Sequence, residues 1–226
     1  MMDTSLTAAI GVGFLLGVRH AADVDHIAAI SAFVSQDRSL ARSCLLGTFW
    51  GAGHTAALLG AGLATIGFKM TISPALGRAF ETLVALVLIL LGGHVVLRTM
   101  AMLALGEHAH GKAPPHVHIG GDVAHSHAGV FQSGRRPFVI GVLHGMAGSA
   151  ALMLFVLATI PSPLAGVLYI AMFGLGSTAG MLALSGLIAV PFVLTANRGG
   201  HANTVIRLGA GLASVVLGAW LLCTQP

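Results

Sequence analysis

The stretch LAGVLYIAMFGLGSTAGMLALSGLIAVPFVL, residues 164–194, contains no charged side chain. A helix of about 20 mostly apolar residues is long enough to cross the hydrocarbon core of a bilayer, so this stretch predicts a transmembrane helix. The whole chain of 226 residues shares this character, with 56% hydrophobic and 8% charged residues and a mean hydropathy of +0.91. Because soluble domains carry about 25% charged residues, the composition excludes a soluble enzyme, a nucleic-acid-binding module and a disordered chain. We therefore predict an all-α, polytopic membrane protein.

Five further stretches are long and apolar enough to cross the membrane, which makes six predicted transmembrane helices. The fifth of the six is rich in glycine and contains Pro191 near its end, which leaves open whether it is straight, tilted or broken. The first residues lack the basic region of a secretory signal, so the first stretch is expected to stay in the protein as a helix. The six predicted spans are 5–33, 44–68, 76–103, 137–160, 164–194 and 203–222.

The basic side chains between the predicted spans lie mostly on one side of the membrane. The connections between spans 1 and 2, 3 and 4, and 5 and 6 carry eight arginine and lysine residues, whereas the opposite side carries Lys69 and Arg78. Connections rich in Lys and Arg stay in the cytoplasm, so both termini are predicted to lie outside it, in a bacterial-type inner (plasma) membrane. The eight residues are Arg38, Arg42, Arg98, Lys112, Arg135, Arg136, Arg198 and Arg207.

The two halves of the chain resemble each other in three places that follow one another in the same order. Each half holds three predicted spans, so the second half would enter the membrane from the opposite side, as in transporters built from inverted repeats. In such transporters the substrate site lies near the midplane, where the halves meet. The matches are Gly17-Val18-Arg19-His20 with Gly141-Val142-Leu143-His144, 50–56 with 173–179, and 91–93 with 217–219, at offsets of 124, 123 and 126 residues.

This internal repeat predicts three parts of the chain. The first three-helix repeat covers residues 1–105 and the second covers residues 137–226. Between them, residues 106–136 form a cytoplasmic loop that is rich in histidine.

Five ionisable side chains lie close together inside the first predicted span. In a continuous helix, His20, Asp23 and His26 would share one face with Arg19, and Asp25 would point away by about 100°. Charged groups at membrane depth are costly and usually mark a substrate pathway. Imidazoles and carboxylates together suit a divalent transition metal such as Ni, Co, Zn or Cu. The alternative is structural, with an Arg19–Asp23 ion pair and with His26 at the cytoplasmic interface.

Polar residues in later spans extend this candidate metal site. His54 lies in a glycine-rich part of the second span, where small residues let helices approach closely, although an interhelical hydrogen bond would explain it equally well. If the two halves face each other, His144 and Ser177 would lie opposite His20 and His54. The candidate metal ligands are therefore His20, Asp23, Asp25, His26 and His54, with a possible second-half site at His144 and Ser177.

The segment Arg19-His20-Ala21-Ala22-Asp23-Val24-Asp25-His26-Ile27 resembles the signature of the nickel/cobalt transporter (NiCoT) family, a histidine followed after four residues by Asp-His in a transmembrane helix. Phe49-Trp50-Gly51-Ala52-Gly53-His54-Thr55 is similar to the second motif of that family. The six predicted spans and Leu143-His144-Gly145-Met146-Ala147-Gly148-Ser149 look more like the related urease-accessory nickel permeases.

The resemblance implies that His20, Asp23, Asp25 and His26 select and pass the metal, and that His54 contributes. Larger members of the family have eight helices, so this chain lacks a first and a last one by comparison. Their acid-and-threonine motif in the second half has no counterpart here, where Gly148-Ser149-Ala150 and Ser177-Thr178 are neutral.

The predicted loop at 106–136 contains half of the twelve histidines of the chain, often as His-x-His. Such tracts bind late first-row metals loosely, and the glycines and prolines between them argue against a folded domain. A merely polar linker is the alternative. The histidines expected to capture metal are His108, His110, His116, His118, His125 and His127.

Together these features predict a secondary transporter of Ni²⁺ or Co²⁺ in the inner membrane, with uptake as the expected direction. The expected partners are the divalent ion, the lipid bilayer and a cytoplasmic metallochaperone, with no nucleic acid, no enzymatic activity and no cofactor beyond the transported ion. The chain has no Gly-x-x-x-x-Gly-Lys segment for binding ATP. Three alternatives stay open: an efflux permease that uses the loop as a collector, a membrane metalloenzyme, and a haem-binding membrane protein.

Overall fold

The computed structural model describes residues 4–68, 73–104, 130–147, 157, 159–160, 162–196 and 201–224. Within these residues the protein contains seven α-helices and no strand. The predicted all-α class is therefore confirmed for the described part of the chain. The helices are α1 (Thr4–Ala21), α2 (Val24–Val34), α3 (Leu40–Phe68), α4 (Pro74–Ala104), α5 (Val130–Gly145), α7 (Pro163–Ala196) and α8 (His201–Thr224).

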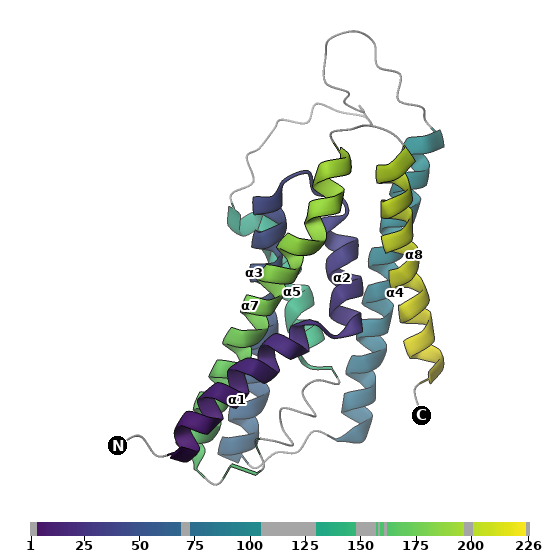
Figure 1. Ribbon diagram of the computed structural model, residues 1–226. Coiled ribbons are helices and arrows are strands. Elements are labelled where there is room, and N and C mark those ends of the chain that lie inside the picture. The colour runs from purple at the N-terminus through teal and green to yellow at the C-terminus, as the bar shows by residue number, and fades with distance from the viewer. Residues whose placement is uncertain are drawn as a thin grey trace.

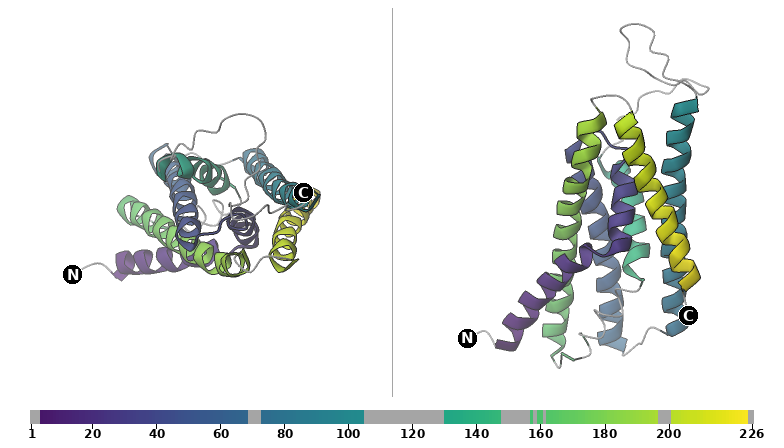
Figure 2. Two further views of the ribbon diagram at one scale, coloured as in Figure 1. Left: turned by 90° about the horizontal axis from the view of Figure 1, so that it is seen from above. Right: turned by 45° about the vertical axis from the view of Figure 1, so that its right-hand side comes forward.

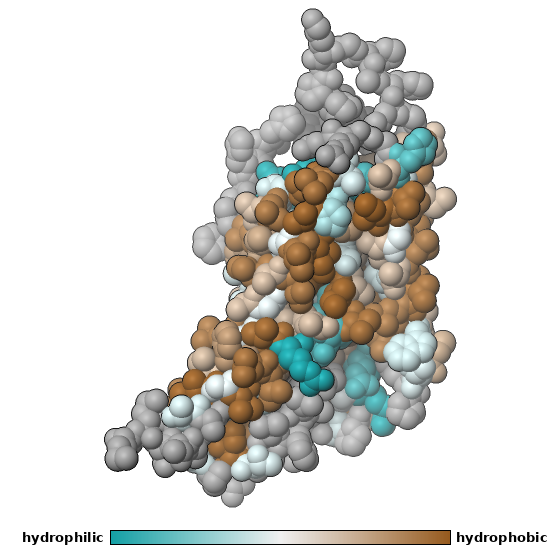
Figure 3. All heavy atoms as spheres, viewed as in Figure 1, coloured by the Kyte–Doolittle hydropathy of each residue, from teal (hydrophilic) through white to brown (hydrophobic). Residues whose placement is uncertain are grey.

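Three of these helices are long and apolar enough to cross a membrane. They are Ala75–Ala104 of α4, Pro163–Ala196, which is α7, and His201–Thr224, which is α8. Large apolar side chains cover their outer faces, and the surface over α7 and α8 is mostly hydrophobic (Figure 3). Leu90 and Leu97 of α4, for example, are each 71% exposed. A face of this kind is stable against lipid rather than water, and it supports a multi-pass membrane protein.

The short helix α2 runs through the centre of the bundle. Seen end-on, it is surrounded by the longer helices (Figure 2, left), and it packs against α3, α4, α7 and α8. Its apolar residues fit that position, since Ala29, Ile30, Ala32 and Val34 are at most 1% exposed. The helix α1 lies obliquely against α7 at the edge of the bundle (Figure 1).

Glycines bring α1 against α7 and α5 against α3. A Cβ added at Gly17 would overlap the carbonyl oxygen of Phe173, and a Cβ added at Gly141 would overlap that of Trp50. Helices that meet at glycine approach closely, because no side chain separates their backbones. The helices α4 and α8 approach closely in the same way, because an added Cβ at Gly92 would overlap the carbonyl oxygen of Gly211.

The first predicted span, 5–33, is wrong as a single helix. The chain leaves helical geometry after Ala21, and α2 begins at Val24, with Asp23 extended at φ −64° and ψ 149°. The Asp23 carboxylate contacts the His20 ring. This side-chain contact and a backbone turn, in which the amide of Asp23 donates to the His20 carbonyl, stabilise the junction. The positions of Asp25 and His26 relative to His20 therefore differ from those in a continuous helix.

The other predicted spans match helices at shifted boundaries. The helix α3 begins at Leu40 rather than at residue 44, and α7 is continuous through Pro191. The helix α5 begins at Val130, inside the predicted loop, and ends at Gly145. Most of the remainder of the predicted fourth span, residues 148–156, lies outside the described residues.

Candidate metal centre

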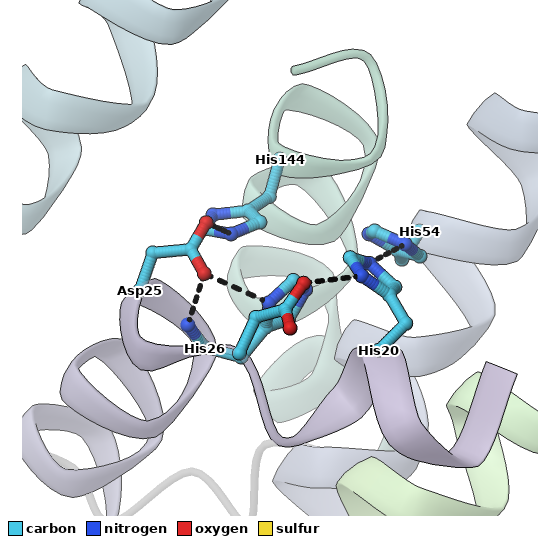
Figure 4. Close-up of polar contacts among 6 residues, drawn as sticks. His20, Asp25, His26, His54 and His144 are labelled. Atoms are coloured by element: carbon cyan, nitrogen blue, oxygen red, sulfur yellow. Dashed lines mark hydrogen bonds and ion pairs between the residues drawn. The ribbon is translucent and has the colours of Figure 1, made fainter. Parts of the chain in front are cut away.

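Four histidines from four helices meet inside the bundle (Figure 4). They are His20 at the end of α1, His26 in the first turn of α2, His54 in α3 and His144 at the end of α5. All four side chains are buried, with exposed fractions between 0% and 7%. The ring centroid of His26 lies 4.5 Å from that of His20, 5.3 Å from that of His54 and 4.4 Å from that of His144. His26 is therefore the centre of the cluster.

The break between α1 and α2 produces this arrangement. At the junction the amide of Ala22 donates to the carbonyl of Arg19 and the amide of Asp23 donates to that of His20, both at 3.0 Å. A second helix then starts at a new angle and turns His26 back toward His20. An analogous turn follows His144, where the amide of Ala147 donates to the His144 carbonyl at 3.1 Å.

His20, His26 and His54 form the first group of possible metal ligands. One ring nitrogen or other ligand atom from each lies within 4.8 Å of those of the other two, and the Nε2 atoms of His20 and His54 are 3.1 Å apart. Two nitrogens that each lie about 2.1 Å from one metal ion are about 3 Å apart when they subtend a right angle there. The spacing of this pair therefore fits coordination of a single ion.

Asp25, His26 and His144 form the second group, again with ligand atoms within 4.8 Å of one another. The Oδ2 atom of Asp25 lies 2.9 Å from Nε2 of His144, and its Oδ1 atom lies 3.2 Å from Nδ1 of His26. The Asp25 carboxylate also accepts a hydrogen bond from the His26 amide at 3.0 Å. Since His26 belongs to both groups, the two possible metal positions are adjacent.

Carboxylates orient two of the histidines in the first group. Asp23 contacts Nδ1 of His20 at 2.7 Å, which leaves Nε2 of His20 toward His54. Asp25 contacts Nδ1 of His26, and Nε2 of His26 is buried without a protein partner among the described residues. The Nδ1 atom of His54 is likewise buried without a protein partner among the described residues. Histidines that bind metals commonly use one ring nitrogen for the ion and the other for a carboxylate, which is the pattern of His20 and His26.

Two aromatic side chains that the sequence did not indicate as site residues form walls of the centre. Trp50 stacks on His26, with centroids 5.5 Å apart and an interplanar angle of 24°, and it meets the His144 ring edge-on at 5.4 Å. Phe173 stacks on His20 at 5.5 Å. Trp50 and Phe173 are the first residues of the matched segments 50–56 and 173–179. That match between the halves is the sequence feature that could have indicated them.

The predicted ligands fall into three sets in the structure. His20, His26 and His54 come together, Asp25 joins His144, and Asp23 supports His20 while its own side chain is 53% exposed. The alternative of an Arg19–Asp23 ion pair does not hold, because every ion pair among the described residues joins a histidine to an aspartate. Ser177 is fully buried beside Gly17, outside both groups.

The six histidines of the predicted loop are not among the residues that the structure describes. They are His108, His110, His116, His118, His125 and His127.

Comparison with known proteins identifies the family. The chain is 36% identical to the urease accessory protein UreH of Bacillus sp. (strain TB-90) over 222 residues, which cover 96% of this chain and 92% of the relative. The chain belongs to the UreH family. A second relative of this UreH family member is the chloroplast protein FOR GROWTH AND FERTILITY 2 of Arabidopsis thaliana, which is 25% identical over 96% of this chain and 58% of its own length. No family model matches the chain, and no solved structure matches it.

Proposed function

We propose that this UreH family member is a secondary transporter that takes up Ni²⁺ or Co²⁺ through the buried histidine and aspartate cluster. The observation that carries the proposal is that His26 belongs to two groups of three possible ligands, one with His20 and His54 and one with Asp25 and His144. Two adjacent sites with a shared ligand allow an ion to move by exchanging one ligand at a time. A permeation pathway needs binding that is spread over several sites, so that the ion can also leave.

The ligand chemistry favours a borderline transition metal. Imidazole nitrogens bind Ni, Co, Zn and Cu, whereas Mg and Ca prefer shells made only of oxygen. The cluster offers four imidazoles and one carboxylate at its centre. Within this set, the NiCoT-like motif at His20–Ile27 and the relationship to a urease accessory protein support nickel or cobalt as the transported metal.

We further propose that the site lies between two inverted three-helix repeats, 1–105 and 137–226. The packing supports this proposal through pairs of equivalent contacts. Gly17 meets Phe173 across the α1–α7 interface as Gly141 meets Trp50 across the α5–α3 interface, and these are the residues that the sequence match between the halves pairs. The turns that follow His20 and His144 are equivalent in the same way. Discontinuous helices at the midplane are typical binding elements of such transporters.

The proposed topology has six crossings, with both termini outside the cytoplasm of a bacterial-type inner membrane. Supporting it, the start of α1 and the end of α8 lie at one end of the bundle, and the end of α4 and the start of α5 lie at the other end (Figure 1). The histidine-rich segment 106–136 would then face the cytoplasm and pass metal to a metallochaperone.

Uptake of radioactive nickel or cobalt into proteoliposomes tests the proposal. We expect His26→Ala to abolish uptake, because it removes a ligand from both groups. His94→Ala is the matched control, since His94 is an exposed histidine on α4 that belongs to neither group. Equal uptake by His26→Ala and the unsubstituted protein would contradict the proposal. Inside-out vesicles loaded with a metal-sensitive dye give the direction of transport.

A further inference from the structure

Three arginines gather at the end of the bundle that lies opposite the two termini. Arg38 follows α2, Arg98 lies near the end of α4 and Arg207 lies near the start of α8. These three helix ends lie at the same end of the molecule (Figure 1). The positive charges of Arg38 and Arg98 both act on Arg207. Like charges that act on one another repel, and an anion bound between them offsets that repulsion.

Arg207 is the buried member of this arginine cluster, which consists of Arg38, Arg98 and Arg207. Its side chain is 9% exposed, and its Nε atom has no hydrogen-bond partner among the residues that the structure describes. A guanidinium group keeps its charge in proteins, and burying such a charge without a partner is costly. Arg38 and Arg98 are exposed.

Within the described part of the chain, no carboxylate balances this cluster. The ion pairs found there all join histidine to aspartate. Arg98 donates a hydrogen bond from Nη1 to the side-chain oxygen of Gln36, which is a neutral acceptor. Burial raises the pKa of the neighbouring Asp37, and the positive charge that acts on that carboxyl is the charge of Arg42.

We propose that Arg38, Arg98 and Arg207 bind a phosphate group between α2, α4 and α8, carried by an anionic phospholipid headgroup or by free phosphate. Arginine presents a planar fork of donors that matches the oxygens of phosphate. Basic pockets between transmembrane helices bind the headgroups of anionic lipids. The candidate donors are the buried Nε of Arg207 and the exposed guanidinium groups of Arg38 and Arg98.

The position of this phosphate site connects it to the metal centre through α2. The first turn of α2 carries Asp25 and His26, and the connection that follows its last turn carries Arg38. The helix packs directly against α8 and α4. A phosphate bound at the far end would therefore hold α2 to α4 and α8 while its first turn holds the metal ligands.

Thermal unfolding of the full-length protein in neutral detergent micelles tests this inference. One arm adds phosphatidylglycerol and compares it with the same amount of phosphatidylcholine. The other arm adds inorganic phosphate and compares it with chloride at equal ionic strength. We expect one of the two test additions, anionic phosphatidylglycerol or inorganic phosphate, to raise the unfolding midpoint by roughly 2–4 °C. The arm that responds identifies the source of the phosphate group.

Charge-removing variants separate a specific site from a general effect of charge. Arg98→Gln, Arg38→Gln and Arg207→Gln should each lose the shift in unfolding midpoint. If Arg207→Gln prevents folding, the two substitutions of exposed arginines still test the site. Arg78→Gln is the matched control, because Arg78 is exposed at the opposite end of the same helix as Arg98. The inference fails if neither addition shifts the midpoint, or if Arg98→Gln and Arg38→Gln respond like the unsubstituted protein.

Discussion

Asp25 contacts His144 across 119 positions of sequence, with 2.9 Å between Oδ2 and Nε2. The other oxygen of the same carboxylate lies 3.2 Å from Nδ1 of His26. One side chain therefore orients two imidazoles, one in α2 and one at the end of α5. In this way it joins the first half of the chain to the second inside the candidate metal centre.

Replacing Asp25 with asparagine should weaken metal binding by about 10–100-fold, the usual effect of losing a carboxylate that orients ligating histidines. The amide keeps the size of the side chain, but it removes the negative charge that would offset a dication and it can accept at only one of its two terminal atoms. Calorimetric titration of the purified protein with Ni²⁺ and Co²⁺ measures the change directly.

Asp23→Asn is the control for that substitution. Asp23 contacts only His20 among the four histidines, and its side chain is 53% exposed. Water can therefore replace part of the interaction with His20 that the variant loses. We expect a smaller loss of affinity than for Asp25→Asn. The reverse order would mean that Asp25 does not hold the ligands as its contacts indicate.

The ligand types could be predicted from the sequence, but their arrangement could not. The costliness of charge in a membrane was enough to single out His20, Asp23, Asp25 and His26 within a short segment. A helical wheel, however, assumes a continuous helix, and the break at Ala22 and Asp23 moves Asp25 into the cluster. The break is not marked by a side-chain cap at the start of α2, because the Asp23 carboxylate contacts His20 instead of a backbone amide of that helix.

Contacts between distant segments were the second feature that the sequence could not predict in full. The match between the halves placed His144 opposite the first half, and the structure brings it to Asp25 and His26. It also paired Trp50 with Phe173, but a repeat alone does not say that their rings would cover His26 and His20. Side-chain stacking depends on helix rotation, which the spacing of apolar residues determines only coarsely in a helix that is apolar on all sides.

Gly17→Ala should destabilise the fold by about 1–3 kcal/mol, the usual cost of forcing an added group into a packed interface. The new methyl group would overlap the carbonyl oxygen of Phe173, which is part of a helix backbone that cannot move aside by itself. Gly11→Ala on the same helix is the control, because nothing lies within 4 Å of its added Cβ. Thermal unfolding in detergent compares the two, and equal midpoints would argue against close packing of α1 on α7.

Replacing the six loop histidines by alanine should lower uptake at scarce metal while leaving the maximal rate near its original value. In the proposed role of collector, the segment raises the local metal concentration without supplying a ligand to the buried groups. Rates measured over a range of nickel concentrations separate these two effects. A loss of the maximal rate would instead give the loop a role in translocation. The substituted residues are His108, His110, His116, His118, His125 and His127.

Tryptophan fluorescence can report metal entry into the cluster, because the two tryptophans differ sharply in position. Trp50 is 1% exposed and stacks on His26, whereas Trp220 is 58% exposed on α8. Ni²⁺ and Co²⁺ quench indole emission at short range. In the Trp220→Phe variant, where Trp50 is the remaining tryptophan, micromolar metal should therefore quench most of the emission. In the Trp50→Phe variant the emission of Trp220 should stay nearly unchanged. Similar quenching in both variants would indicate that the metal binds elsewhere, because only a site beside His26 brings the ion close to Trp50 and leaves Trp220 distant.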